Sequence, residues 1–342
     1  MRAITSAVWE TLIGAWENYE EAKKCYDVAL SIAWDQSLVE HQALWLIGLA
    51  NTYQRLGEFN KAHEHYEGAL NVSREGGFRK IECLALGGLG VVKEDLGEYR
   101  NAIELYEQAL QISKELKDRE RESLWLGNLG GVFNGVGEYH KSIEYRSQAL
   151  SVARDIGDRQ RESFQYIGLG NTHFRLGDYR SAIECFERAR SIARALGNRQ
   201  IEATSIGSLG NSHKNLAEYT SAIDEYEQAL QIVGEIGDRQ GEATWLGNLG
   251  NVYFMLDQSQ KAIAYYEKAL TISQSIGFLQ GEAIILGHIA NMHTSLDSYE
   301  TAIKFHTDAL GIFKRIGDRE GEAQHSPIWE LRTQIWRNSQ RR

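Results

Sequence analysis

The sequence has almost no proline, few cysteines and no long apolar run. Pro327 is the single proline among 342 residues. Because proline breaks helix interiors, a chain so poor in proline and well supplied with Ala, Leu and Glu favours an all-helical protein. The cysteines, Cys25, Cys83 and Cys185, are odd in number and widely separated, which is typical of reduced thiols in a cytoplasmic protein. No run of about 18 apolar residues is present, so we expect no membrane span.

The sequence also lacks the motifs of common enzyme chemistry. It contains no G-x-x-x-x-G-K-S/T phosphate loop, no G-x-S-x-G and no H-E-x-x-H. We therefore expect no catalytic residues, no cofactor and no enzymatic activity. The formal net charge of −10 argues against a nucleic-acid partner, because nucleic-acid binders normally present a basic surface.

The chain is instead built on a period of forty residues. The motif Leu-Gly-Glu/Asp-Tyr/Phe recurs as LGEF at 56–59, LGEY at 96–99, VGEY at 136–139 and LGDY at 176–179, and it decays to LAEY, LDQS and LDSY over the next three periods. Small residues and Ala-Leu pairs keep the same spacing. Such a period predicts a solenoid, in which neighbouring units bury one continuous core.

Each unit carries two helical patterns. In the seventh unit they run from about Arg239 to Met255 and from about Gln260 to Ser275. The glycine of Leu-Gly-Glu-Tyr suits a left-handed cap between the helices. Gly237 is expected to cap the second helix, and Asp238 to cap the start of the next. The predicted solenoid spans 1–325, with repeats at about 3–35, 39–76, 79–117, 119–157, 159–197, 199–237, 239–277 and 279–317.

These motifs resemble the tetratricopeptide repeat. The forty-residue form with Leu-Gly-Asn-Leu-Gly-Asn is similar to the Leu-Gly-Asn repeats of Pins-type polarity adaptors, and equally to tetratricopeptide arrays of bacterial signalling proteins. The resemblance implies an all-α, right-handed solenoid whose first helices line a concave groove, and a scaffold or adaptor role in protein–protein interaction.

Glycines inside the first helices need a structural reason, since each costs about 1 kcal/mol relative to Ala. One small-residue column comprises Ala50, Gly90, Gly130, Gly170, Gly210, Gly250 and Ala290. We expect it where the first helix of a repeat approaches its second helix. A further column, Gly87, Gly127, Gly207, Gly247 and Gly287, lies three residues earlier, on nearly the same face.

An asparagine column follows the glycines. It comprises Asn51, Asn171, Asn211, Asn251 and Asn291, with Val91 and Gly131 in its place in two repeats. Asparagine is an indifferent helix former, so propensity does not explain the column. In the family this position faces the groove, where an amide can donate to and accept from a peptide backbone. The alternative is a ladder of bonds between neighbouring helices.

Groove positions one turn further along vary from repeat to repeat, as a selective site requires. Of these we select Arg55, Arg175 and Lys214 for charge recognition, and Phe174 and Phe254 for apolar contact. The lysine of the chaperone-type carboxylate clamp would stand four residues before the asparagine column. That position holds only Ile or Gly, so no such clamp is expected.

Three histidines share another column. His173, His213 and His293 stand where other repeats have Tyr or Phe. They come from separate repeats without a Cys or carboxylate at ligand spacing, so we interpret them as packing residues and expect no metal site.

The ends of the chain are rich in tryptophan. Residues 326–342 begin with Ser-Pro, a good helix start, and predict a capping helix with a basic tail. The alternative is that the tryptophans there and near the start, such as Trp9 and Trp16, bind a partner or a second copy of the chain.

The sequence thus predicts a non-enzymatic adaptor that binds an extended peptide or a helix in its groove. The alternative is a regulatory or sensor subunit of a larger signalling or defence system, which would bind a folded protein.

Overall fold

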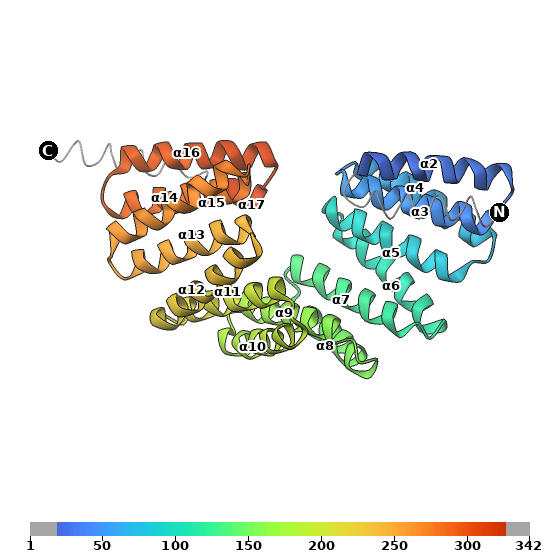
Figure 1. Ribbon diagram of the computed structural model, residues 1–342, viewed down its shortest axis with the longest axis horizontal. Helices are drawn as coiled ribbons and strands as arrows, with labels where there is room; N and C mark the ends of the chain where they lie inside the picture. Colours follow the sequence, from blue (N-terminus) through green and yellow to red (C-terminus); the bar gives the residue numbers. More distant parts are fainter. Residues whose placement is uncertain (1–18, 326–342) are drawn as a thin grey trace. The chain divides into compact units, whose positions relative to one another are not determined.

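The computed structural model describes residues 19–325, and the structure there is helical throughout. Sixteen α-helices and no strands occur in these residues, which confirms the expected all-α repeat fold (Figure 1). Among the helices described, none is both long enough and apolar enough to cross a membrane. The predicted capping helix at 326–342 lies outside the described residues, as do Trp9 and Trp16.

The chain divides into two compact units, Met1–Leu176 and Gly177–Arg342. The helices described in the first unit are α2 (Tyr19–Asp35), α3 (Val39–Arg55), α4 (Phe59–Glu75), α5 (Arg79–Asp95), α6 (Tyr99–Glu115), α7 (Arg119–Gly135), α8 (Tyr139–Asp155) and α9 (Arg159–Leu176). Those of the second unit are α10 (Tyr179–Leu196), α11 (Arg199–Asn215), α12 (Tyr219–Ile236), α13 (Arg239–Met255), α14 (Ser259–Ser275), α15 (Leu279–Ser295), α16 (Tyr299–Ile316) and α17 (Arg319–His325).

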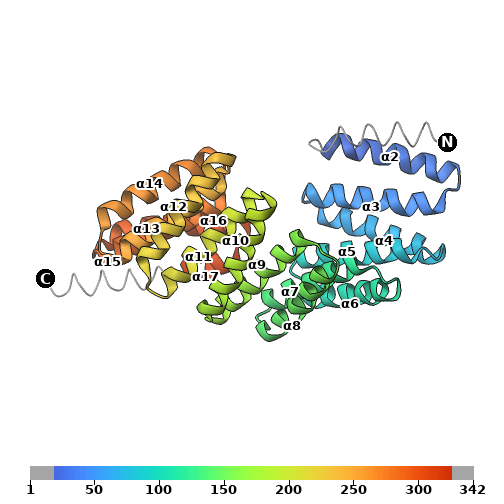
Figure 2. The same cartoon turned by 60° about the horizontal axis from the view of Figure 1, so that its bottom comes forward.

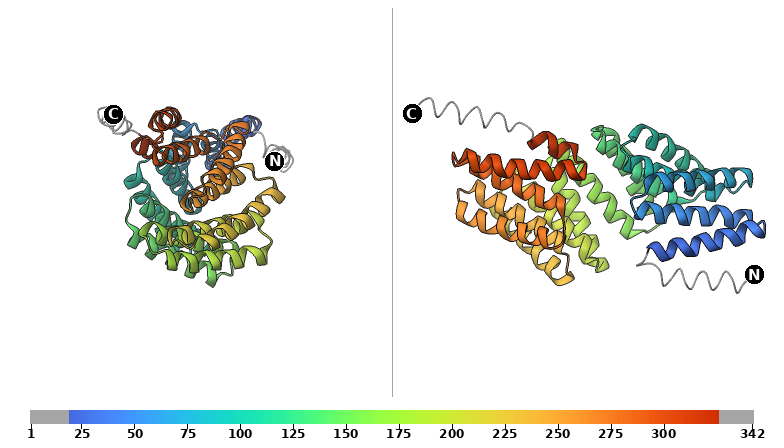
Figure 3. Two further views of the ribbon diagram at one scale, coloured as in Figure 1. Left: turned by 90° about the vertical axis from the view of Figure 1, so that its left-hand side faces the viewer. Right: turned by 90° about the horizontal axis from the view of Figure 1, so that it is seen from above.

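Within each unit, successive helices pack against one another along the chain. The pairs α3/α4, α5/α6 and α7/α8 form hairpins in the first unit, and α11/α12, α13/α14 and α15/α16 do so in the second. Figure 2 shows α5 to α8 side by side, and both views of Figure 3 show the same stacking of hairpins within a unit. Each helix buries its apolar face against its neighbours, as a solenoid requires.

The turns follow the chemistry expected from the motifs. In the four Leu/Val-Gly-Glu/Asp turns the glycine has a positive φ of 74–84°, where a side chain is strained. Ala217, Asp257 and Asp297 adopt the same conformation later in the chain with φ near 58°. Gly237 ends α12 in the left-handed region, and the Asp238 carboxylate accepts from the Gly241 amide at 2.9 Å. In the seventh repeat the first helix has the predicted bounds, and the second begins at Ser259, one residue early.

The two glycine columns make two different contacts. At Gly90 an added Cβ would lie 2.6 Å from the Tyr106 ring of the same hairpin, which confirms the first expectation. At Gly87 an added Cβ would instead lie 2.1 Å from the Trp125 ring of the next repeat. At Gly87, and likewise at Gly207 beside Trp245, the second column therefore serves packing between repeats, because glycine leaves room there for a large ring.

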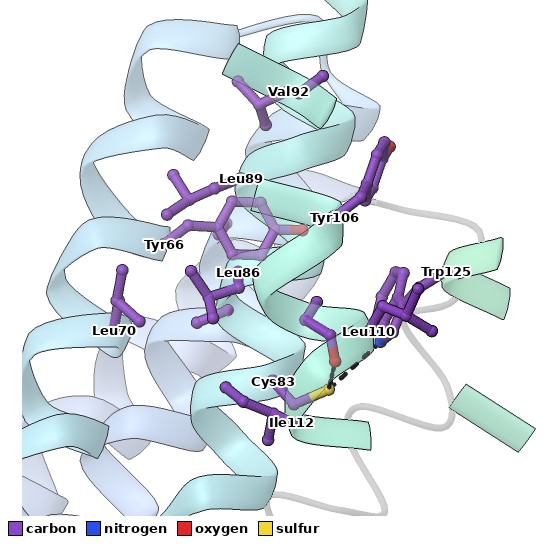
Figure 4. Packing of buried hydrophobic residues seen from close by; sticks show 14 of the residues in the cluster. Tyr66, Leu70, Cys83, Leu86, Leu89, Val92, Tyr106, Leu110, Ile112 and Trp125 are labelled. Carbon is purple, nitrogen blue, oxygen red and sulfur yellow. Dashed lines mark hydrogen bonds between the residues drawn. The ribbon is translucent and has the colours of Figure 1, made fainter. Parts of the chain in front are cut away.

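Figure 4 shows this packing around α5. Tyr66 and Tyr106, both fully buried, flank the helix, and the Trp125 indole N–H donates to the Cys83 sulfur at 3.2 Å. The Cys83 thiol in turn donates to the Ala109 carbonyl at 3.3 Å. Cys83 thus belongs to the core between α5, α6 and α7.

Glutamates that recur at multiples of forty residues, each three residues after an arginine, are more deeply buried than surface ion pairs would be; they include Glu82, Glu162 and Glu202. The spacing suggests surface ion pairs, yet the Glu202 side chain is only 2% exposed. It pairs at 2.8 Å with both Arg194, from the last turn of α10, and Arg199, the first residue of α11. Arg199 also pairs with Glu235 at the end of α12. Similar clusters surround Glu82 and Glu162, so these carboxylates tie consecutive helices together.

Candidate binding groove and the Arg146 pocket

Three of the five asparagines of the column are bonded to a tyrosine of their own hairpin. Asn211 Oδ1 accepts from the Tyr226 hydroxyl at 2.6 Å, and Asn251 Oδ1 accepts from Tyr266 at 2.7 Å. Asn51 accepts from Tyr66 in the same way. The tyrosine stands fifteen residues after the asparagine, and its ring is buried in the core. These amide oxygens therefore satisfy buried hydroxyls, which would otherwise be costly.

Neighbouring first helices are also linked through this column. Asn211 Oδ1 receives a second hydrogen bond, from Asn248 Nδ2 at 3.2 Å. Asn251 Nδ2 lies 3.1 Å from His288 Nε2. Burial lowers the pKa of His288 to about 4, with Lys214 and His325 adding to the effect, so its neutral ring accepts this bond at pH 7. These hydrogen bonds between neighbouring first helices match the alternative given for the asparagine column, in which the asparagines link the helices of adjacent repeats.

Asn171 and Asn291 have different surroundings. The residues fifteen positions later are Phe186 and His306, neither of which has a hydroxyl. Both asparagines are exposed, and within residues 19–325 neither side chain makes a hydrogen bond. Their amides are therefore available for recognition, in contrast to those bonded to tyrosine.

The variable positions also fall into two groups. Arg55 and Arg175 are exposed, whereas Phe174, Lys214 and Phe254 are half-buried. Burial lowers the pKa of Lys214 below its ordinary value. Phe254 packs against the core cluster formed by α13 to α15, so part of its surface serves stability.

The histidine column contributes polar pairing and stacking in the second unit. The His213 ring nitrogen Nδ1 lies 2.7 Å from a Glu218 oxygen, and the His293 ring stacks on Phe305 at 5.7 Å between centroids. Among the residues described, no three His, Cys, Asp or Glu side chains converge as ligands of a metal ion would.

Among residues 19–176, cavities lie on the face of the odd-numbered helices, and two of them concern the candidate groove. One, of about 880 Å³, lies between α2, α3 and α5 and includes Asn51 and Arg55. The other, of about 700 Å³, is bounded by α5, α7 and α9. We call the second cavity the Arg146 pocket; its polar lining includes Glu94, Asn128, Arg146, Arg161, Gln165 and Asn171.

Arg146 enters this pocket from α8, at a position where most repeats have a buried aromatic ring. The corresponding residues are Tyr26, Tyr66, Tyr106, Phe186, Tyr226, Tyr266 and His306. Three glycines accommodate its side chain: an added Cβ would lie 2.5 Å from Arg146 Cγ at Gly130, 1.9 Å from Nη1 at Gly168 and 3.4 Å from Nη2 at Gly131. The guanidinium thus occupies space that side chains at these positions would fill.

The charge of Arg146 has no direct partner in the described part of the chain. Throughout residues 19–325, no carboxylate lies within 4 Å of the guanidinium, and its Nε is buried without a hydrogen bond. Burial lowers its pKa to about 10, although the charge of Glu94 opposes this change. Arg146 is therefore a half-buried cation at pH 7, with its Nε shielded from water. Glu94 accepts a hydrogen bond from the Tyr106 hydroxyl at 3.0 Å, and burial raises its pKa above the ordinary value.

Sequence reasoning found Asn171 in this pocket but missed Arg146. The signal was present, because an arginine interrupts a column of aromatic residues and Gly131 interrupts the asparagine column in the same repeat. The glycine is visible in the alignment of the first helices, whereas the arginine is visible only when the second helices are aligned as well.

The repeats themselves are confirmed by comparison with protein families. A tetratricopeptide repeat model matches residues 80–155, 120–195 and 200–275, more than half of the chain, and a second matches residues 43–75. The chain belongs to the tetratricopeptide repeat family. A search of curated proteins found no match.

Several solved tetratricopeptide structures share the fold. The apo form of RapI is 17% identical with a TM-score of 0.66, covering 98% of this chain and 99% of that one. Aspartyl phosphate phosphatase F from Bacillus subtilis is 16% identical with a TM-score of 0.62, covering 93% and 94%. A signal-transduction ATPase with a tetratricopeptide repeat sensor, from Pyrococcus horikoshii, is 16% identical with a TM-score of 0.60, covering 92% and 53%. At these identities the likeness concerns the fold alone.

Proposed function

We propose that this tetratricopeptide protein is a non-enzymatic adaptor that binds an extended peptide segment on the face of its odd-numbered helices. The observation that carries the proposal is the Arg146 pocket, a cavity of about 700 Å³ on that face. Its lining combines unpaired polar groups with exposed apolar side chains such as Phe164. This mixture suits a peptide, which offers both backbone polar groups and side chains.

The contacts of the asparagine column refine the proposed contact residues. Asn171 and Asn291 are proposed to hold peptide backbone with their whole amides. Asn51, Asn211 and Asn251 already accept from tyrosine, so any contribution they make comes through their amide nitrogens. Arg55, Arg175 and Lys214 remain the proposed selectivity residues, with Phe174 and Phe254 as apolar contacts.

The forty-residue period and the Leu-Gly-Asn motif support a place among the Leu-Gly-Asn adaptors and the similar bacterial signalling arrays. The reduced thiols and the charge support action in the cytoplasm on a protein partner. Dimerisation through the tryptophan-rich ends stays a prediction, since Trp9, Trp16, Trp329 and Trp336 lie outside the described residues.

The experiment is an affinity capture from native lysate with the full chain. The groove variant is Asn171→Ala with Arg175→Ala, both exposed positions of α9. The matched control is Asn101→Ala with Arg188→Ala, which removes the same two residue types from exposed positions of α6 and α10. We expect a partner held by the wild type and the control to be lost by the groove variant. Equal retention by all three would contradict binding on this face.

The same capture tests the alternative of a regulatory subunit with a folded partner. The partner recovered is digested to short peptides, and these are offered again to the wild type. Rebinding of one peptide supports the adaptor. A partner that binds only when folded would favour the regulatory alternative.

A further inference from the structure

The Arg146 pocket breaks two regularities of the chain at one place. In three other hairpins a buried tyrosine stands opposite an asparagine, as Tyr226 does opposite Asn211. In the fourth repeat the same positions hold Gly131 and Arg146. The fourth repeat therefore lacks the hydrogen-bonded asparagine–tyrosine pair, and in its place the Arg146 guanidinium lies beside the pocket. Local departures from an otherwise consistent pattern are expected at functional sites.

A half-buried cation without a partner among the described residues is unfavourable for the protein alone. Burying a charge is costly unless it is paired and hydrogen-bonded. Arg146 has neither compensation within the described residues, because Glu94 lies beyond ion-pair distance and Nε has no acceptor. An anion supplied from outside would provide both, since a guanidinium can donate two parallel hydrogen bonds to one carboxylate.

The pocket is also shaped to admit such a group. Gly131 lies directly beside the guanidinium, and an added Cβ there would come within 3.4 Å of Nη2 and 4.0 Å of Glu94 Oε1. The asparagine that most repeats carry at this position would occupy the approach to the charge. Glycine leaves it open, with Asn128 and Asn171 among the lining residues.

The remaining charges of the lining favour a single negative charge on the ligand. Arg161 is already paired with Asp158 at 3.0 Å and donates to the Glu120 carbonyl at 2.7 Å. Of the two arginines in the lining, only Arg146 is then without an ion-pair partner among the described residues, and Glu94 lies nearby. A monoanion matches this balance, whereas a doubly charged phosphate would place a second negative charge beside Glu94.

We propose that the Arg146 pocket binds a carboxylate of the peptide ligand, with the Arg146 guanidinium as its charged donor and the amides of Asn128 and Asn171 on the flanking backbone. This inference rests on the proposed function and names the chemistry of its ligand. The carboxylate belongs to an acidic side chain or to the peptide's C-terminus. It differs from the chaperone-type clamp because its cation comes from the second helix of a repeat.

The probes are four pools of nonapeptides whose positions are random mixtures of Ala, Leu, Ser and Asn, except for a defined central residue in three of the pools. One pool carries a central Glu and a second a central Gln, both with blocked termini. A third pool has a free C-terminal carboxylate and no acidic side chain, and a fourth carries a central phosphoserine with blocked termini. Binding to the immobilised full chain is measured by the amount retained.

We expect the wild type to retain the Glu pool or the free-carboxylate pool at least about ten-fold better than the Gln pool, since hydrogen bonds to charged groups are strong. Whichever of the two is preferred identifies the source of the carboxylate.

Arg146→Gln should reduce this preference to about one while retaining the Gln pool as well as the wild type does. Arg146→Tyr, which restores the residue of neighbouring repeats, should do the same and serves if Arg146→Gln fails to fold. Arg188→Gln, at an exposed position of α10 outside the proposed contact residues, is the matched control and should keep the preference.

Each contrary result has a distinct meaning. Retention of no pool by the wild type would contradict the proposed function, and this inference with it. Equal retention of the Glu, free-carboxylate and Gln pools would leave peptide binding intact and overturn the carboxylate site. Preference for the phosphoserine pool would overturn the choice of a monoanion, and a preference that persists in both Arg146 variants would remove Arg146 from the site.

Discussion

Asn171 and Asn211 stand one repeat apart in the same column of the sequence, yet their contacts differ. Asn211 accepts hydrogen bonds from Tyr226 and Asn248, whereas Asn171 is exposed beside the Arg146 pocket. The difference depends on which residue stands fifteen positions later. A column of identical residues therefore contains both structural and recognition positions, and stability measurements can separate them.

We expect Asn211→Ala to lower the free energy of unfolding by about 1–3 kcal/mol, because it leaves the buried Tyr226 hydroxyl without its acceptor. Asn171→Ala, at an exposed position, should change it by less than about 0.5 kcal/mol. Urea denaturation of the two variants beside the wild type measures the difference. Equal effects would show that the tyrosine bond contributes nothing specific.

His288, again a single residue, provides a prediction of how the stability of the protein depends on pH. Its pKa in the folded chain is lowered to about 4 from an ordinary value of 6.5. Between these values the unfolded chain binds a proton that the folded chain does not, so stability falls as the pH drops from 6.5 towards 4. Down to pH 5 this amounts to about 2 kcal/mol.

The variant that tests this is His288→Asn, which places at 288 the residue found at 248. We expect the variant to lose less stability than the wild type between pH 7 and pH 5, as measured by urea denaturation at each pH. His306 and His325 also have lowered pKa values, but they are present in both proteins. Parallel pH profiles would contradict the prediction.

Between elements, the buried glutamates join the end of one helix to the start of the next. Glu202 contacts Arg194 of α10 and Arg199 of α11. Glu242 in the following repeat is more exposed, and within residues 19–325 its ion pair is with Arg239. The two carboxylates occupy the same column with different surroundings. They therefore form a matched pair for measuring what the cluster contributes to helix stacking.

We expect Glu202→Gln to destabilise the protein by about 2 kcal/mol, because it removes the charge that accepts hydrogen bonds from two arginines at a buried position. Glu242→Gln should cost less than about 1 kcal/mol. The arginines hold the pKa of Glu202 below its ordinary 4.5, so its contribution is complete above about pH 4.5 and is lost as the pH falls through the lower folded value. Denaturation at pH 7 and pH 3.5 tests both statements; a Glu202→Gln effect of equal size at the two pH values would contradict the second.

Helices and turns were the part of this fold most accessible from sequence. The forty-residue period places the helix ends within a residue in the seventh repeat, and the Gly-Asp-Arg motif identifies Asp238 as a cap. The burial of Glu202 was not accessible, because the spacing from Arg199 looks like an ordinary surface pair and the second arginine comes from the preceding helix. The surroundings of Arg146 were not accessible for a related reason: Gly168 belongs to α9 and meets the α7/α8 hairpin of Arg146, Gly130 and Gly131 only when the repeats stack.

At the scale of the whole molecule, the described helices do not pack around one common hydrophobic core. Each helix contacts its sequence neighbours and the next repeat, and α7 contacts α6, α8 and α9. In such an array, stability is approximately a sum of repeat and nearest-neighbour terms. Damage to one repeat should therefore remain local.

Leu129→Ala provides the test, since Leu129 is fully buried in α7. The cavity should cost about 2–5 kcal/mol. Because only the neighbouring interfaces lose contacts, we expect faster amide hydrogen exchange in α6 to α9 and wild-type rates in α13 to α16. Mass spectrometry of peptides from the exchanged protein resolves these segments. Uniform acceleration from α2 to α16 would contradict local coupling and would show that the array opens as one cooperative unit, so that a ligand in the Arg146 pocket would stabilise every repeat instead of its neighbours.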